Sequence, residues 1–301
     1  MKFVTFRRDN RTSAGMLVDG DRVLDLGEVP GLNAKTVLDV VLAGEDGVAA
    51  ARDAAKRANA GNTVALNAVT LLAPIPHPRK NVFCIGRNYV EHVAEGARAR
   101  GTDLKLPEFP QIFTKPQTAV IGPGDEVPYD TQVTQKLDYE VELGVIIGRR
   151  GKNIPKDRAL SHIFGYTVIN DVTARDLQRR HEQWFKGKGI DGSCPMGPWI
   201  VHASAIKDPQ ALDIKLRVNG EQRQNSNTKH MIFDLKTIIE SLSLGMTLEP
   251  GDVIATGTPS GVGFAMNPPG LLKGGDVIEA EVEGIGILRN TVREVPHKVE
   301  G

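Results

Sequence analysis

Hydrophobic and polar residues alternate near the start of the chain and predict a small unit that contains both strands and helices. Residues 15–26 (GMLVDGDRVLDL) alternate around an Asp-Gly pair at 19–20, which is a strong signal of a β-hairpin. Residues 36–60 are rich in alanine and have helical spacing. Gly44 and Gly47 interrupt this pattern, so we predict two helices with a break near these glycines.

A proline-rich segment follows this unit. The run LLAPIPHPRK at 71–80 contains three prolines and is typical of an extended linker, because proline and the residue before it disfavour helix. We therefore predict a domain boundary near residue 75. A small N-terminal α+β domain would occupy residues 1–75, and a larger domain would occupy residues 76–301.

The larger domain has short apolar runs separated by glycine and proline, which predict many strands. Helical spacing occurs only around 89–97, 173–186 and 232–244, without regular alternation of strand and helix. This pattern argues against Rossmann and TIM-barrel folds. We expect an α+β, mostly β fold that is built on a mixed and mainly antiparallel β-sheet roll. The expected strands include NVFCIG, QIFTKP, YEVELGVIIG, HIFGYTVIND, DIKLRVNGE, DVIATG and DVIEAEVEGIGILRNTV.

Composition argues against a nucleic-acid-binding protein, a disulfide-rich protein and a membrane protein. The 301 residues carry 37 basic and 37 acidic side chains, so no excess charge suggests a nucleic-acid or membrane partner. The two cysteines, Cys84 and Cys194, cannot form a disulfide framework, and a reducing compartment is the default. The first residues lack the apolar region of a signal peptide, and no segment approaches the length of a membrane span. We expect a cytoplasmic protein.

The segment LDYEVELGVIIG at 137–148 raises the question of a metal site. Alternation predicts one strand that carries Glu140 and Glu142 on the same face, about 7 Å apart. A solvated strand face would explain them, but the buried GVIIG that follows favours a partner for these charges. A hard divalent cation is one such partner. Asp171, which ends the run HIFGYTVIND, is available as a third ligand or as a cap for the next helix.

Other residues could supply acid–base chemistry. His92 and Glu95 are three apart on an expected helix, which suits either a general base and its partner or an ordinary surface pair. Lys186 and Lys188 in WFKGKGIDG are catalytic candidates, although solvated lysines are common. The turn GTPSGVG at 257–263 matches neither GxGxxG nor a P-loop, and no GxSxG motif indicates a serine hydrolase.

In this order, the segments resemble the fumarylacetoacetate hydrolase family over about residues 81–290. The matching segments are GRNYVEHVAE, FTKP, LDYEVELGVIIG, NDVTARDLQ, GKGIDGSCPMGPW and GDVIATGTPSGVG. The nearest branch is bacterial, has a small N-terminal domain, and includes oxaloacetate decarboxylase-like members and acylpyruvases. Gly189 and Ile190 depart from the serine and phenylalanine that usually follow the lysine of this family.

The resemblance implies a fold, a partner and a site. Family members share a mixed β-roll and are usually homodimers that bind Mg²⁺ or Mn²⁺. The implied metal ligands are Glu140, Glu142 and Asp171. The implied catalytic residues are His92 and Glu95, in a lid, and Lys188. The implied substrate-binding residues are Arg175, Gln178 and Thr258.

The expected function is metal-dependent cleavage of a C–C bond in a 2,4-dioxo acid or oxaloacetate. This reaction would release pyruvate through an enolate, by acylpyruvate hydrolysis or by decarboxylation. One alternative is an isomerase of a 2-oxo or 2-hydroxy dienedioate from the same family. Another is a non-catalytic metal protein that binds 2-oxo acids.

Overall fold

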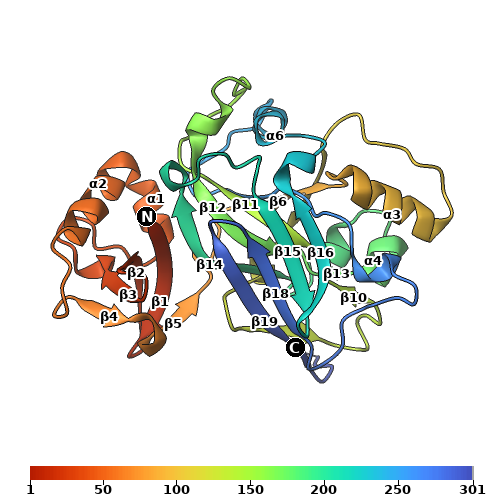
Figure 1. Ribbon diagram of the computed structural model, residues 1–301, viewed down its shortest axis with the longest axis horizontal. Helices are drawn as coiled ribbons and strands as arrows, with labels where there is room; N and C mark the ends of the chain where they lie inside the picture. Colours follow the sequence, from red (N-terminus) through yellow and green to blue (C-terminus); the bar gives the residue numbers. More distant parts are fainter. Residues whose placement is uncertain (300–301) are drawn as a thin grey trace.

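Two large sheets dominate the computed structural model, which describes residues 1–299 (Figure 1). Within these residues the larger sheet has twelve strands and the smaller sheet has five. The order in the larger sheet is β4 (Thr63–Ala65), β3 (Arg22–Asp25), β2 (Arg11–Val18), β1 (Lys2–Arg8), β14 (Cys194–His202), β12 (Ile163–Asn170), β11 (Val141–Ile147), β17 (Val253–Ala255), β6 (Val82–Gly86) and β7 (Gln111–Lys115). Off this path, β5 (Thr70–Leu72) pairs with β1, and β8 (Val120–Ile121) pairs with β14.

The smaller sheet covers one face of the central strands. Its order is β16 (Glu221–Asn227), β15 (Asp213–Val218), β18 (Val277–Val282), β19 (Gly286–Glu294) and β9 (Glu126–Tyr129). Alternate β11 residues, from Val141 to Ile147, share one hydrophobic cluster with residues of β15, β18 and β19. Ile146, on the opposite face of β11, joins a second cluster. Because both faces are covered, every residue of β11 and β12 is buried.

The N-terminal strands extend the larger sheet. The predicted hairpin at Asp19 and Gly20 is confirmed: Val18 pairs with Arg22, and Asp19 and Gly20 in the loop between them both have positive φ. The two predicted helices are α1 (Val37–Leu42) and α2 (Gly44–Ala55), which meet next to Gly44. β1 pairs with β14, so this segment is hydrogen-bonded to the rest of the fold. The domain boundary at residue 75 stays a prediction.

Four α-helices lie in the remainder of the described residues, and they confirm two predictions and correct one. α3 (Val90–Arg100) and α6 (Leu235–Ser243) form where helical spacing was noted. The single helix predicted at 173–186 is wrong. Residues 173–174 form β13 (Thr173–Ala174), which pairs with β10 (Leu137–Asp138), and two short helices follow, α4 (Arg175–Arg180) and α5 (Phe185–Lys188). Glu182 between them has a left-handed backbone, which interrupts the helix.

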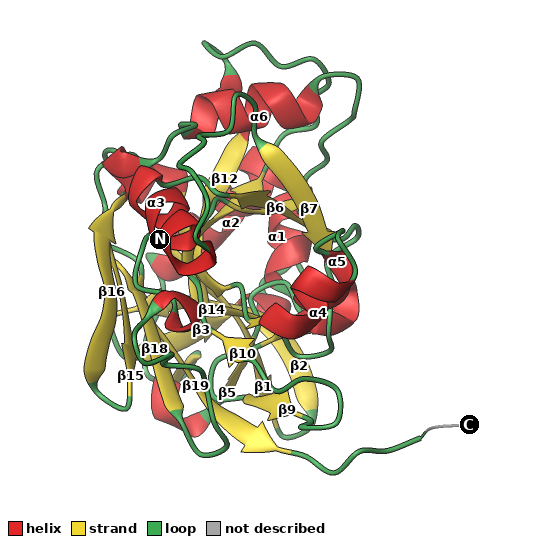
Figure 2. Ribbon diagram, turned by 90° about the vertical axis from the view of Figure 1, so that its right-hand side faces the viewer, coloured by secondary structure: helices red, strands yellow, loops and turns green. Residues whose placement is uncertain are grey.

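The mixed, mainly antiparallel architecture agrees with the predicted α+β fold. α3 and α4 lie at the end of the molecule opposite the N-terminal strands (Figure 1), and Figure 2 shows α3 facing the pair α4 and α5. No helix among residues 1–299 has both the length and the apolar character that crossing a bilayer requires.

One buried side chain ties three segments together beside this end of the molecule. Asn88, which follows β6, donates hydrogen bonds to the carbonyl oxygens of Phe233 (3.1 Å) and Thr256 (2.7 Å). Its Oδ1 accepts the N–H of Phe233 at 2.8 Å. Asn88 thereby fixes the start of α3 to the chain before α6 and after β17.

Asn88→Ala should lower the free energy of unfolding by about 2–4 kcal/mol, because it leaves buried backbone groups without partners. Chemical denaturation of wild type and variant measures this change. The matched control is Asn81→Ala, which removes an exposed asparagine and one exposed hydrogen bond. An equal effect of both substitutions would contradict the role given to Asn88.

Candidate active site

The site begins where the strand predicted at 137–148 is interrupted. β10 ends at Asp138 and β11 starts at Val141, so the prediction of one continuous strand is wrong. The backbone N–H of Glu140 donates to Oδ1 of Asn170 at 2.9 Å, and the carbonyl of Glu140 accepts the N–H of Asp171 at 2.8 Å. These bonds replace regular strand pairing and fix Glu140 and Asp171 side by side at the ends of β11 and β12.

Three carboxylates from separate segments come together at this point. Glu140, Glu142 and Asp171 each offer an oxygen, and the three oxygens lie within 4.8 Å of one another. All three side chains are buried. Asp171 therefore belongs to the cluster and does not cap the helix that follows, whose N-cap residue Ala174 has no side-chain hydrogen bond.

Buried cations bind two of the three carboxylates. Lys188 Nζ lies 2.7 Å from Glu140 Oε2 and 2.6 Å from Asp171 Oδ2. Arg175 Nη1 lies 2.7 Å from Glu140 Oε1. Lys115 Nζ lies 2.6 Å from Asp171 Oδ1, and it also donates to the carbonyl oxygens of Val172 and Lys188. Every carboxylate oxygen of Glu140 and Asp171 thus has a cationic partner.

Glu142 has a different environment. Its Oε2 accepts the N–H of Gly257 at 2.7 Å, and no ion pair to it occurs among residues 1–299. Burial and the charges of Asp171 and Glu140 raise its pKa well above the ordinary value. Burial also opposes ionisation of Glu140, but Lys188 and Arg175 outweigh it and lower the pKa of Glu140 to about 2. A buried carboxylate beside two others and without its own cation fits a hard divalent cation that prefers oxygen ligands.

The predicted pair His92 and Glu95 lies on α3. His92 Nδ1 is 2.8 Å from Glu95 Oε1, and Glu95 Oε2 accepts the N–H of Gly261 at 2.8 Å. Gly261 has positive φ, and a Cβ there would lie 2.0 Å from the carbonyl oxygen of Arg223. The glycine-rich turn therefore fixes the position of the Glu95 carboxylate, which in turn binds Nδ1 of the imidazole. Nε2 of His92 remains available for other partners.

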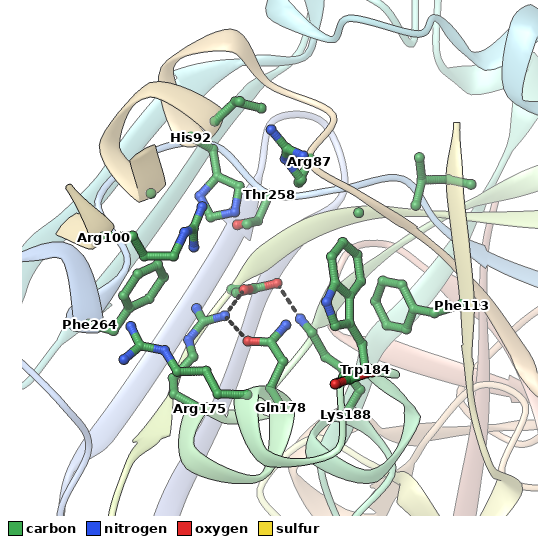
Figure 3. Close-up of a pocket in the computed structure, with 17 residues that line it drawn as sticks. Arg87, His92, Arg100, Phe113, Arg175, Gln178, Trp184, Lys188, Thr258 and Phe264 are labelled. Carbon is green, nitrogen blue, oxygen red and sulfur yellow. Dashed lines mark hydrogen bonds and ion pairs between the residues drawn. The ribbon is translucent and has the colours of Figure 1, made fainter. Parts of the chain in front are cut away.

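One cavity of about 380 Å³ brings most of the predicted residues together (Figure 3). Its lining includes His92, Glu140, Arg175, Gln178, Lys188 and Thr258. Glu95, Glu142 and Asp171 lie outside the lining and support it through the contacts described above. Lys186 is exposed, whereas Lys188 is buried in the carboxylate cluster.

Several residues of the site were not predicted. Lys115 is the last residue of the strand in FTKP. It was missed because the sequence does not distinguish a buried lysine from an exposed one at a strand end. Asp138 precedes the carboxylate pair and binds Arg175 Nε at 2.8 Å, as well as the N–H groups of Gly263 and Phe264. Its place in the alternating run 137–148 was the available signal. No pattern in the sequence indicated the remaining residues of the cavity wall. These residues are Arg87, Arg100, Phe113, Trp184 and Phe264.

Comparisons with known proteins agree with the sequence resemblance. A family model described as fumarylacetoacetate (FAA) hydrolase C-terminal matches residues 81–293. The chain is 44% identical over 308 residues to oxaloacetate tautomerase YisK of Bacillus subtilis, covering 97% of this chain and 100% of the relative.

Two solved structures share the fold over nearly the whole chain. Fumarylacetoacetate hydrolase from the psychrophile Exiguobacterium antarcticum has a TM-score of 0.83 and 42% identity, covering 98% of this chain and 100% of the other. Maleylpyruvate hydrolase from Sphingobium sp. SYK-6, in complex with manganese (II) ion and pyruvate, has a TM-score of 0.78 and 30% identity. That match covers 98% of this chain and 99% of the other.

Lys115→Met should lower the free energy of unfolding by about 3–5 kcal/mol, because it leaves one oxygen of buried Asp171 without its cation. Denaturant unfolding of the metal-free protein measures the change. Lys186→Met, which removes an exposed lysine, is the matched control and should stay within about 0.5 kcal/mol of wild type. The role of Lys115 would be refuted by equal stability of the two variants.

Proposed function

The chain belongs to the fumarylacetoacetate hydrolase family and is an enzyme of that family; on this premise we propose that it binds Mg²⁺ or Mn²⁺ and acts on 2-oxo acids through an enolate. The observation that carries the proposal is the buried cluster of Glu140, Glu142 and Asp171 at the floor of a cavity lined by cations. These carboxylates would hold the metal. When bound, the ion supplies Lewis acidity toward the carboxylate and the 2-oxo oxygen of a substrate.

Lys188 is placed to stabilise negative charge that develops on the 2-oxo oxygen. Its ammonium group is buried at the cavity floor, and the charges of Asp171 and Glu140 outweigh burial and raise its pKa. The group therefore stays protonated near neutral pH and donates hydrogen bonds. A preorganised donor of this kind contributes about 3 kcal/mol to transition-state stabilisation in other enzymes.

His92 is placed to move a proton at C3 of the substrate. Glu95 accepts the hydrogen bond from Nδ1–H, which makes Nε2 the basic ring nitrogen. Nε2 would take a proton from C3 as the enolate forms, and a proton from Lys188, which solvent would replace, would convert the enolate oxygen to the enol hydroxyl. The reverse steps would remove the hydroxyl proton and return a proton from Nε2 to C3. Gln178 and Thr258 line the same cavity and would orient the 2-oxo acid.

We infer that the main reaction is keto–enol interconversion of oxaloacetate. Support comes from the name of the B. subtilis relative, which matches over the full length, and from an enolate site that needs one proton acceptor. C–C cleavage by hydrolysis or decarboxylation is the second candidate, because His92 and Glu95 could equally activate a water. Isomerisation of a dienedioate uses the same groups and is separated by its products. We also propose a homodimer, as expected from the family resemblance.

Glu142→Gln should remove Mn²⁺ binding and slow catalysis at least about 100-fold, because the metal loses a charged ligand. Calorimetric titration with Mn²⁺ measures binding, and the ultraviolet absorbance of enol oxaloacetate measures tautomerisation. A coupled pyruvate assay measures C–C cleavage in the same samples. Glu45→Gln, on the exposed surface of α2, is the control. Full activity of Glu142→Gln would exclude the metal assignment, and pyruvate release faster than enol loss would favour cleavage as the main reaction.

His92→Ala should lower kcat for tautomerisation by about 10²–10⁴-fold and leave Mn²⁺ affinity unchanged, because it removes the proton acceptor but no ligand. Steady-state kinetics and Mn²⁺ titration measure the two effects. His77→Ala removes an exposed histidine outside the cavity and should behave as wild type. An unchanged kcat in His92→Ala would contradict proton transfer by this residue.

A further inference from the structure

The cavity has more positive charge than the proposed chemistry uses. Four arginines line it, namely Arg87, Arg100, Arg175 and Arg179. Arg175 is paired with Asp138 and Glu140 at the cavity floor. The other three form no ion pair with any carboxylate among residues 1–299, although Glu182 also lines the cavity. These three guanidinium groups come from separate segments: the loop after β6, the end of α3, and α4.

Some donors at the cavity have no partner. Arg87 Nε and Arg175 Nη2 are buried and make no hydrogen bond to any described residue. Among the described residues, the Arg87 side chain donates one hydrogen bond, from Nη2 to the carbonyl oxygen of Lys105. Unpaired buried guanidinium donors are costly, so these atoms indicate a missing acceptor. A carboxylate fits this role because its two oxygens match the fork of a guanidinium.

The guanidinium groups are also close enough to repel one another. Burial, and then the charges of Arg87, Arg179 and Arg175, lower the pKa of Arg100. Figure 3 shows Arg87 and Arg100 on either side of His92, above Arg175. Arg100 and Arg179 are exposed, which places them at the opening of the cavity. A bound anion would relieve this repulsion.

The sequence of α3 makes room for Arg100. Gly96 lies one helical turn before Arg100, and a Cβ at this position would be 2.8 Å from Arg100 Nη2 and 3.3 Å from Nη1. The arginine folds back across the glycine instead of extending into solvent. Gly96 also lines the cavity, so the absent side chain directs the guanidinium toward it.

We propose that Arg87, Arg100 and Arg179 form an anion subsite at the outer end of the cavity, which binds a second carboxylate of the 2-oxo acid. The subsite rests on the proposed function, in which the first carboxylate and the 2-oxo oxygen occupy the cavity floor. It selects 2-oxo dicarboxylates over 2-oxo acids with an apolar end. Arg87 and Arg100 lie beside His92, so the second carboxylate also holds C3 near the imidazole.

Matched ligands test this subsite. Oxaloacetate and 2-oxobutyrate differ by a carboxylate or a methyl group at the far end, and 2-oxoglutarate and 2-oxopentanoate are the longer pair. Calorimetric titration of the Mn²⁺-loaded protein should show at least about tenfold tighter binding of the dicarboxylate in one pair, as one charge-assisted contact provides. Equal affinity within both pairs would overturn the subsite.

Variants locate the effect. Arg100→Gln and Arg179→Gln should each weaken dicarboxylate binding about tenfold and leave the methyl analogue unchanged. Gly96→Ala should weaken it in the same direction, because the new Cβ displaces Arg100. Arg98→Gln, an exposed arginine of α3 outside the cavity lining, is the control and should match wild type.

The outcomes separate this inference from the proposed function. Loss of binding for both members of a pair in Arg100→Gln would overturn the subsite and indicate a general effect on the cavity. Mn²⁺-dependent binding of the methyl analogues without any preference for dicarboxylates would reject the subsite and keep the proposed function. Failure of every 2-oxo acid to bind the Mn²⁺-loaded wild type would reject both.

Discussion

The buried charge cluster at the ends of β11 and β12 is the constraint on which this part of the fold depends. Carboxylates in a dry interior are tolerated only with partners, and here the partners come from distant segments. Lys115 is brought by β7, Lys188 by α5 and Arg175 by α4. Each ion pair therefore fixes the position of one element around the cavity. The same ion pairs thus position the side chains of the candidate site and hold β7, α4 and α5 around the cavity.

Charge is distributed unevenly within the cavity. At the floor, Glu140 and Asp171 are neutralised by side chains, whereas Glu142 has only a backbone donor. At the opening, arginines have no carboxylate partners among the described residues. A floor with one carboxylate that lacks a cation, below a positively charged opening, suits a metal below and an anionic substrate above. In the proposed function, this separation would give a bound 2-oxo acid one orientation.

The sequence predicted correctly those elements whose conformation depends on residues close together in the chain. The hairpin at 19–20 depends on two residues with positive φ, and α6 on its own apolar periodicity, so both were predictable. The strand at 137–148 was predicted as continuous because the side chain that interrupts it, Asn170, lies far away in sequence. The prediction of one helix at 173–186 was wrong because Thr173 and Ala174 pair with a distant strand and Glu182 has a left-handed backbone, and neither feature shows in the local spacing.

The candidate site was predicted only in part, because contacts between residues distant in sequence determine it. Alternation alone placed Glu140 and Glu142 on one face, but joining them with Asp171, His92 and Lys188 required the family resemblance. Lys115 was missed because a buried and an exposed lysine look alike in one sequence. The direction of Arg100 depends on a glycine four positions earlier, and this becomes visible only when the helix is built.

The hydrogen bond from the N–H of Gly261 to Glu95 makes the imidazole depend on a segment far away in sequence. His92 and Glu95 both lie on α3, so this single bond orients the carboxylate and, through it, Nδ1 of His92. Only glycine fits at 261, because a Cβ there would lie 2.0 Å from the carbonyl oxygen of Arg223. A larger residue at this one position of the turn would therefore shift the carboxylate and turn the imidazole, although the sequence of α3 stayed the same.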